Sequence, residues 1–200
     1  MAKQIKESVP FVTFYEKENI SPVRQEISDL NKHYKRRESL FHSLGLPPIL
    51  IKDKKILEFG PGSGHNAIYT ASLSPSVYEL VDGNTKGVQE TKAQLKSSHD
   101  VKIKVHHSLF EDFKSNIKFD IVWAEGCLPH QGRPLQLLKK VSSFAREGGI
   151  LCFTTINGVS YLSETLRRLI ADRLFEHQLL DVPEQVQQLC TYFKPHLKTL

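Results

Sequence analysis

Five short apolar runs, separated by segments with helical periodicity, constrain the fold of this chain most. The runs lie at 54–59, 77–82, 101–107, 119–125 and 150–156. Between them, stretches such as NAIYTASLS and RPLQLLKKVSS carry apolar residues every three or four positions, as amphipathic helices do. Alternating strands and helices fold into a parallel sheet with helices on both faces. We therefore predict an α/β fold, a doubly wound, mostly parallel sheet with four helical crossovers.

Helical segments also flank the predicted sheet. Residues 21–46 have helical spacing, with Ser21 as a candidate N-cap and Pro22 at the first helical position. After the fifth run come SETLRRLIADRLFEHQLL and PEQVQQLCTYF, which also favour helices. We predict three regions: an N-terminal helical segment at 1–48, a core at 49–156 and a helical extension at 157–200.

The composition disfavours several classes of protein. No apolar run is long enough to span a membrane, and MAKQIKESVPF lacks the apolar centre of a signal peptide. The three cysteines, Cys127, Cys152 and Cys190, form no CxxC pair, so we expect neither a disulfide framework nor a metal site. We expect a cytoplasmic protein with no membrane partner.

The net charge of +5 raises the possibility of a nucleic-acid partner. The lysines are scattered along the chain, however, and YKRRE at 34–38 is its one dense basic run. A solvated basic helix face accounts for that run, so the sequence does not favour nucleic-acid binding.

Three glycines lie at the turn between the first predicted strand and the following helix, in EFGPGSGH at 58–65. Glycine permits positive φ and close approach of a ligand to the backbone. Open parallel sheets bind ligands at the carboxyl ends of their strands, where this turn lies. The pattern predicts a nucleotide-type cofactor, and the alternative is a tight turn that is only incidentally rich in glycine.

The residues around these glycines discriminate between two classes of cofactor. A dinucleotide fingerprint has the spacing G-x-G-x-x-G, and here His65 stands at its third glycine position. Glu58 precedes the first glycine by two residues, where its carboxylate would repel a pyrophosphate and attract an ammonium group. The loop therefore favours a ligand with a cationic amino-acid end, and an NAD-dependent oxidoreductase becomes the weaker alternative.

The glycine loop resembles motif I of the class I, Rossmann-like S-adenosylmethionine (SAM)-dependent methyltransferases. VDGNT at 81–85 is similar to the second motif of that family, in which an acidic residue, here Asp82, binds the ribose hydroxyls. FDIVWAEGCLPH at 119–130 and REGGILCFTTI at 146–156 resemble the fourth-strand and fifth-strand motifs. The resemblance covers about residues 50–156.

The loop after the third strand, HSLFEDF at 107–113, departs from the family. The family often has Asp followed by a small residue near the adenine, whereas this chain has Leu109 and Phe110. Glu111 or Asp112 is the alternative contact to the adenine amino group. The cofactor-binding residues that the resemblance and the loop together imply are Glu58, Gly60, Pro61, Gly62, Gly64, His65, Asp82, Gly83, Leu109, Phe110 and Glu125.

Methyl transfer from a sulfonium is an in-line displacement, so the protein mainly aligns the nucleophile and excludes water. A general base is needed when the acceptor holds its proton, as a sugar hydroxyl does. His130, in the loop after the fourth strand, is the first candidate base and Glu125 the second; Gln131 is a weaker candidate for substrate contact. For His130 the alternative is a histidine that only shapes the pocket, and for Glu125 a polar cap on the loop.

The resemblance also implies features at both ends of the chain. An N-terminal helical segment often covers the active site in this family, which would bring Tyr15, Tyr34 and Arg37 near the substrate. Family members normally add two strands after the fifth, and we predict neither of them before Leu200. Helices at 161–193 would then be incompletely covered, which favours association, for example as a homodimer.

We expect an enzyme that methylates an O or N nucleophile of a small molecule or sugar. A methyltransferase fold that binds SAM without turnover is the alternative from another functional class. Methylation of nucleic-acid bases is disfavoured because the fourth motif reads AEGCLPH in place of an N/D-P-P-Y type sequence.

Overall fold

The computed structural model describes residues 10–22, 24–97, 101–129 and 131–194. The chain divides into two compact units, Met1–Thr155 and Ile156–Leu200. The first unit holds the sheet and every candidate site residue. Within the described residues, no helix has the length and apolar character needed to cross a membrane.

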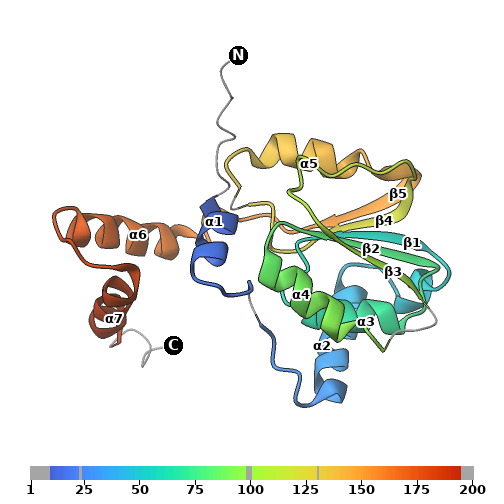
Figure 1. The fold of residues 1–200 in the computed structure, drawn as a ribbon, viewed down its shortest axis with the longest axis horizontal. Coiled ribbons are helices and arrows are strands. Elements are labelled where there is room, and N and C mark those ends of the chain that lie inside the picture. Colours follow the sequence, from blue (N-terminus) through green and yellow to red (C-terminus); the bar gives the residue numbers. More distant parts are fainter. Residues whose placement is uncertain (1–9, 23, 98–100, 130, 195–200) are drawn as a thin grey trace. The chain divides into compact units, whose positions relative to one another are not determined.

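Five parallel strands form the sheet of the first unit, in the order β3-β2-β1-β4-β5 (Figure 1). The strands are β1 Lys55–Phe59, β2 Val77–Asp82, β3 Lys102–His107, β4 Phe119–Ala124 and β5 Ala145–Phe153. The order reverses between β1 and β4, which leaves a switch point at the carboxyl ends of these two central strands. The predicted α/β fold and parallel sheet are confirmed.

Helices cover both faces of this sheet. α2 (Leu30–Ser43), α3 (His65–Ser72) and α4 (Thr85–Gln94) lie on one face, and α5 (Pro134–Ser142) lies on the other (Figure 1). Alternate residues of β1 separate the two cores: Ile56 packs toward α2 and α3, and Leu57 toward α5. β1 thus buries both of its faces.

The N-terminal helical prediction was wrong over residues 21–22 and 24–29. α2 begins at Leu30 because the carboxylate of Asp29 caps it, accepting the backbone N–H of Lys32 at 3.0 Å. Ser21 caps no helix, and its hydroxyl donates instead to Glu90 at 2.6 Å. A further short helix, α1 (Pro10–Lys17), precedes Ser21.

Two predicted crossovers also differ from the structure. β5 begins at Ala145 and α5 ends at Ser142, because Phe119 pairs with Ala145 and donates its N–H to Phe144. Residues 108–118 join β3 to β4 without a helix, and Phe110 and Phe113 fill the core there. The structure therefore has helices in three crossovers rather than four. Asn84 is the N-cap of α4, and its side chain accepts the backbone N–H of Gly87.

The second unit contains α6 (Leu162–Phe175) and α7 (Val182–Phe193). A capping box at Asp181 and Glu184 fixes the start of α7. None of the residues of α6 is buried, and Leu166, Leu169 and Ile170 are among its exposed side chains. Association of this unit stays a prediction.

The first unit also contains a short 3₁₀ helix, η1 (Pro48–Ile51), directly before β1.

Candidate functional site

The glycine loop connects the carboxyl end of β1 to α3. Gly60, Gly62 and Gly64 have φ values of 69°, 60° and 79°, all in the left-handed region. A Cβ at Gly60 would lie 2.6 Å from Cys127 Cβ, and one at Gly64 would lie 2.7 Å from Thr91 Cα. A Cβ at Gly62 would meet nothing closer than Pro22 at 3.5 Å. Internal packing therefore requires Gly60 and Gly64, whereas Gly62 is required by its backbone conformation alone.

This difference gives a first prediction. Gly64→Ala should lower the free energy of unfolding by about 3 kcal/mol, because left-handed strain adds to a clash with the backbone of α4. Gly62→Ala, the matched control, should cost about 1 kcal/mol, because it carries the strain without the clash. Urea denaturation of both variants measures the two costs, and equal costs would contradict the packing assigned to Gly64.

Asp82 ends β2 beside the glycine loop, and only 6% of its surface is exposed. One carboxylate oxygen accepts the N–H of Gly62 at 3.1 Å and the other accepts the N–H of Asn84 at 2.8 Å. Burial raises the pKa of Asp82 to about 6, although these two N–H groups oppose the rise. Each oxygen keeps a lone pair that neither bond uses, so the carboxylate can accept further hydrogen bonds.

Glu58 lies on β1 and faces the layer between the sheet and α2. Its carboxylate accepts the hydroxyl of Tyr78 on β2, and both side chains are buried. Burial raises the pKa of Glu58 to about 7; the hydrogen bond from Tyr78 and the charge of Arg37 oppose the rise, and the charges of Glu125 and Asp82 add to it. Two buried carboxylates at one end of the sheet make this place favourable for a cation.

Arg37 on α2 and Glu125 at the carboxyl end of β4 form a two-pronged ion pair. Each terminal nitrogen of Arg37 donates to one oxygen of Glu125 at 2.8 Å, and Trp123 Nε1 donates to the same carboxylate at 3.0 Å. Burial alone would raise the pKa of Glu125, but Arg37 and Trp123 hold that pKa below its usual value. A carboxylate held ionised and bonded at both oxygens is poorly placed to accept a proton.

One nitrogen of the Arg37 guanidinium has no hydrogen-bond partner among the described residues. The residue is 6% exposed and its guanidinium lies 5.9 Å from the ring centroid of Phe41. Among the described residues, Arg37 Nε is the one buried side-chain nitrogen or oxygen without a hydrogen-bond partner. A buried N–H without an acceptor costs free energy, so an anionic group that accepts from it would be stabilised.

The raised pKa values of Glu58 and Asp82 lead to a prediction about pH. Their ordinary values are 4.5 and 3.8, so these two groups bind more protons in the folded chain than in the unfolded chain between about pH 4 and pH 7. The free energy of unfolding should therefore lose the contribution of these groups as the pH rises through this window. Glu58→Gln keeps the contact with Tyr78 but has no group that titrates there. Between about pH 5 and pH 8, the free energy of unfolding of this variant should therefore fall less than that of the wild type. Urea denaturation at both pH values tests this, and an equal fall in both proteins would contradict it.

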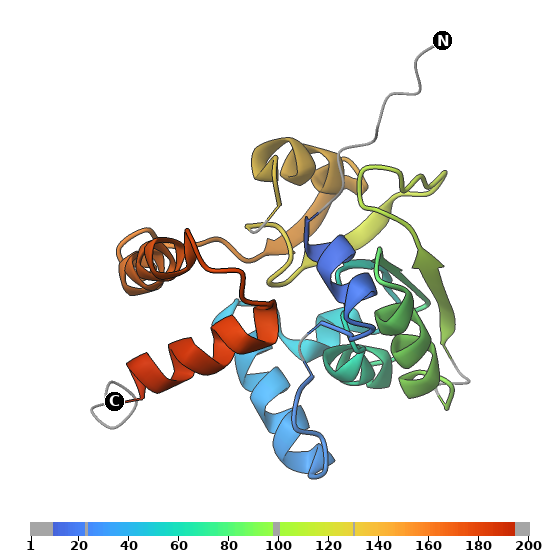
Figure 2. The same ribbon diagram turned by 60° about the vertical axis from the view of Figure 1, so that its left-hand side comes forward.

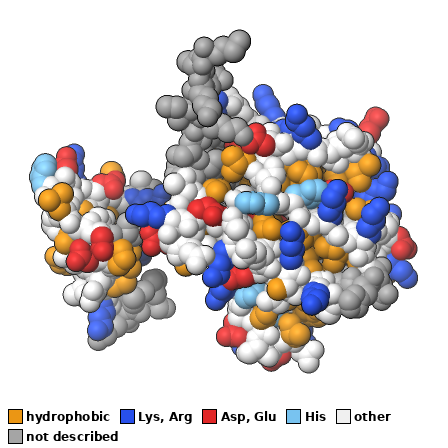
Figure 3. Space-filling view, in the orientation of Figure 1, with side chains coloured by type: hydrophobic (Ala, Val, Ile, Leu, Met, Phe, Trp, Pro, Cys, Tyr) orange, Lys and Arg blue, Asp and Glu red, His pale blue; other side chains and the backbone are white. Residues whose placement is uncertain are grey.

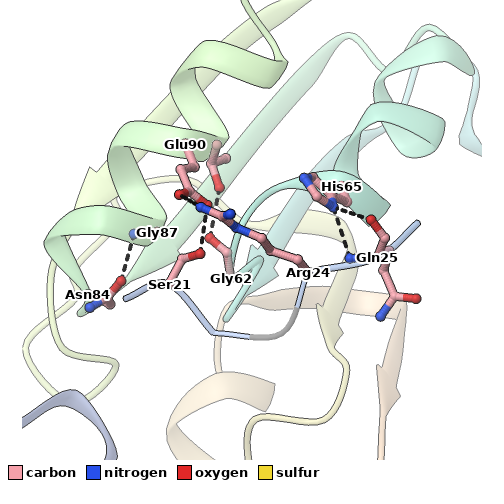
Figure 4. Close-up of polar contacts among 9 residues, drawn as sticks. Ser21, Arg24, Gln25, Gly62, His65, Asn84, Gly87 and Glu90 are labelled. Carbon is pink, nitrogen blue, oxygen red and sulfur yellow. Dashed lines mark hydrogen bonds and ion pairs between the residues drawn. The ribbon is translucent and has the colours of Figure 1, made fainter. Parts of the chain in front are cut away.

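Residues 18–22 and 24–29, which form neither helix nor strand, cross the glycine loop and are called the strap below (Figure 4). Ser21 and Arg24 both bind the carboxylate of Glu90 on α4. The backbone N–H and carbonyl of Gln25 lie 2.9 and 2.8 Å from Nδ1 of His65, the first residue of α3. The strap therefore binds both α3, which follows the glycine loop, and α4, which follows β2.

α1 continues this cover toward β2. Both views place α1 beside the first turn of α4 (Figures 1 and 2), where Glu16 accepts the side-chain amide of Asn84 at 3.2 Å and the backbone N–H of Thr85. Val12 lies near Gly83, since a Cβ at Gly83 would be 3.1 Å from its side chain. Sequence reasoning missed Glu16 and Glu90, because single acidic residues on short helices carry no signal of the partner that they meet.

The remaining cofactor candidates line the carboxyl ends of β1 to β3. Pro61 is buried in the loop, and Leu109 approaches Gly83, with Cδ2 3.0 Å from a Cβ built there. Phe110 is buried edge-on against Phe59 with ring centroids 5.2 Å apart. Glu111 is exposed. The structure thus brings these residues to one edge of the sheet.

The loop after β4 carries the other candidates. Cys127 is packed behind the glycine loop with Sγ donating to Phe59 O at 3.3 Å, and burial raises its pKa well above the ordinary value. Gln131 donates to Cys127 O at 3.0 Å. His130 lies outside the described residues. On α2, Tyr34 packs edge-on against Tyr69 at 5.3 Å. No group of three metal-ligating side chains occurs among the described residues.

Comparison with protein families gives one match. A family model described as "Methyltransferase domain" matches residues 30–198, which is most of the chain. A search of curated protein sequences gave no match.

Solved structures share the fold at low sequence identity. N-methyltransferase NodS from Bradyrhizobium japonicum WM9, in complex with S-adenosyl-L-homocysteine (SAH), is 14% identical over 77% of each chain, with a TM-score of 0.59. Coclaurine N-methyltransferase, bound to N-methylheliamine and SAH, is 14% identical over 67% of this chain and 39% of its own, with a TM-score of 0.52. A ribosomal protein L11 methylase from Lactobacillus delbrueckii subsp. bulgaricus is 17% identical over 76% and 70% of the two chains, with a TM-score of 0.50.

Proposed function

Because the chain belongs to the methyltransferase-domain family, we propose that it transfers a methyl group from SAM to an O or N nucleophile of a small molecule, a sugar among the candidates. The observation that carries the proposal is the group of Glu58, Asp82 and Arg37 around the glycine loop, at the switch point of the sheet. This group offers separate partners for a cation, for hydroxyls and for a carboxylate. An NAD pyrophosphate would meet two buried carboxylates there.

The residues present fit SAM. Asp82 has lone pairs left for ribose hydroxyls, and Arg37 Nε has no acceptor within the described chain and would hold the methionine carboxylate. The charges of Glu58 and Asp82 favour the cationic groups of the ligand. SAH occupies the NodS and coclaurine N-methyltransferase structures.

When bound, SAM supplies an electrophilic methyl group on its sulfonium. The chain contributes position and exclusion of water: the glycine loop and Asp82 fix the cofactor, and the strap and α1 cover the loop. Glu125 holds Arg37 in place, so we assign it a positioning role in preference to the role of general base. His130 stays the candidate base, and a neutral amine acceptor would need it less than a hydroxyl would.

The structural neighbours suggest the class of acceptor. Two of the three structural neighbours are named as N-methyltransferases, and one of them holds a small-molecule ligand. The third is named as a ribosomal protein methylase, so a shared fold does not select small acceptors. A module that binds SAM without turnover is the second candidate, because Glu125 is occupied by Arg37.

Transfer of a labelled methyl group tests the proposal. The full chain would be incubated with methyl-labelled SAM and, separately, a panel of small amines, a panel of sugars, total RNA and total protein. We expect label in a small-molecule fraction, and His130→Ala should slow the reaction of hydroxyl acceptors more than that of amines. Label in RNA or protein alone would contradict the acceptor class, and bound SAM with no product would establish the non-catalytic module.

A further inference from the structure

The edge of the sheet opposite the site is basic. In a parallel sheet all strands begin at one edge, and here Lys55, Val77 and Lys102 pair across the starts of β1, β2 and β3. Lys118 directly precedes β4, and the turn before β1 carries Lys52 and Lys54. We call this the amino edge. Its six exposed lysines are Lys52, Lys54, Lys55, Lys96, Lys102 and Lys118.

Few carboxylates offset these charges. In the described segments of the amino edge the acidic residues are Asp53, Asp120 and Glu147. Asp120 is already bound by Arg146 at 2.7 Å and by the N–H of Lys55 at 2.9 Å. With Arg146 counted, seven cations face three carboxylates, a net charge of +4 among the described residues of this edge. In Figure 3, Lys and Arg side chains gather on the right of the core, where Figure 1 shows the strands beginning.

Exposed aliphatic side chains lie among the lysines. η1 leads into β1, and its Ile49 and Leu50 are 73% and 43% exposed. Leu44, at the C-terminal end of α2, is 52% exposed, and Ile117, beside Lys118, is 37% exposed. Ile51 of the same η1 is fully buried, so this short helix is anchored to the core while its outer residues face solvent.

The side-chain types discriminate between polyanionic partners. Nucleic-acid surfaces combine Arg with aromatic side chains on which bases stack. Here the cations are lysines apart from the paired Arg146, and the exposed aromatic residues of the described first unit, Phe14 and Phe153, lie toward the carboxyl ends of the strands. Lysines interspersed with exposed aliphatic residues are typical of proteins that bind the surface of an anionic bilayer.

We propose that the amino edge docks on a membrane surface containing anionic lipids, with Ile49 and Leu50 entering the headgroup region and the lysines contacting the lipid phosphates. The glycine loop lies at the other end of the strands, so in a docked protein the site faces away from the bilayer. This proposal differs from the expectation of no membrane partner that the sequence suggested, because that expectation considered only spanning segments and signal peptides.

Vesicle co-sedimentation of the full chain tests the proposal. Vesicles of phosphatidylcholine with about one third phosphatidylglycerol should bind the protein, pure phosphatidylcholine should bind it weakly, and added salt should release it. A lysine near an anionic surface contributes about fivefold in partitioning, so Lys52→Gln/Lys54→Gln/Lys118→Gln should lose about a hundredfold. Ile49→Ser/Leu50→Ser should lose about tenfold with the charge unchanged.

The control removes equal charge elsewhere. Lys17→Gln/Lys32→Gln/Lys35→Gln alters three exposed lysines of α1 and α2 and should bind vesicles as the wild type does. Thermal unfolding checks that every variant is folded. The proposal would be overturned if both triple variants lost vesicle binding equally. It would also be overturned if binding did not depend on lipid charge, or if the protein did not bind vesicles. Binding to polyuridylate at least as tight as to vesicles, unaffected by Ile49→Ser/Leu50→Ser, would also overturn it and assign the edge to RNA.

Discussion

Replacing Asp82 by alanine is expected to weaken SAH binding by about a hundredfold, the largest effect on the cofactor of any single change to the loop region. The variant removes the carboxylate that we assign to the ribose hydroxyls, and hydrogen bonds to a charged group are worth about 1.5–3 kcal/mol each. It also leaves the N–H of Gly62 without its acceptor, which loosens the loop itself. Isothermal titration calorimetry with SAH measures the loss directly.

Asp120→Ala is the matched control for this variant. Asp120 also accepts a backbone N–H, that of Lys55, and binds Arg146, but it lies at the opposite edge of the sheet. Its loss should lower stability while SAH binding stays within about twofold of the wild type. Unchanged SAH binding in folded Asp82→Ala would contradict the ribose assignment.

Arg37→Met is expected to have the largest effect on stability. Breaking a buried ion pair by removing one partner costs about 3–5 kcal/mol, and because the side chain of Glu125 is 33% exposed we expect a loss toward the lower end of this range. Glu125 would keep the hydrogen bond from Trp123 and lose both bonds from Arg37. Adding Glu125→Gln removes the uncompensated charge, so the double variant should recover most of the lost stability in urea denaturation.

Cofactor binding separates the two roles of Arg37. If its Nε holds the methionine carboxylate, the double variant should still bind SAH at least tenfold more weakly than the wild type, although it is folded. Glu125→Gln alone keeps the guanidinium and should bind SAH better than the double variant does. Equal SAH affinity in these two proteins would reject the assigned role of Arg37 and leave it purely structural.

The sheet could be predicted because its signals are local. The apolar runs at 77–82 and 119–124 bury both of their faces, and such runs have few alternatives to a parallel strand. The sequence alone likewise indicates the three glycines at a strand-to-helix turn and the acidic residue that ends the next strand, because neither signal requires knowledge of contacts. The structure places all of them at one edge, as the order of a parallel sheet requires.

The features that could not be predicted depend on contacts between residues that are distant in sequence. Residues 21–29 have helical spacing, yet the described ones form no helix, because Glu90 and His65, 40 to 69 residues away, bind Ser21 and Gln25. Glu125 was readable as a base, but its pairing with Arg37, 88 residues earlier, depends on how α2 packs on the sheet. β5 begins at Ala145, five residues before the predicted start at 150, because Ala145 pairs with Phe119. The glycines at 148 and 149 gave no sign of this pairing in the sequence.

Ligand-dependent thermal unfolding of the full chain tests the central claim most directly, with SAM, SAH and NAD in parallel. A ligand at 100 times its dissociation constant stabilises the folded state by about 2.7 kcal/mol, which raises the Tm of a chain this size by several degrees. The account predicts a rise with SAM and with SAH and none with NAD. A rise with NAD alone, or no rise with any of the three, would contradict it.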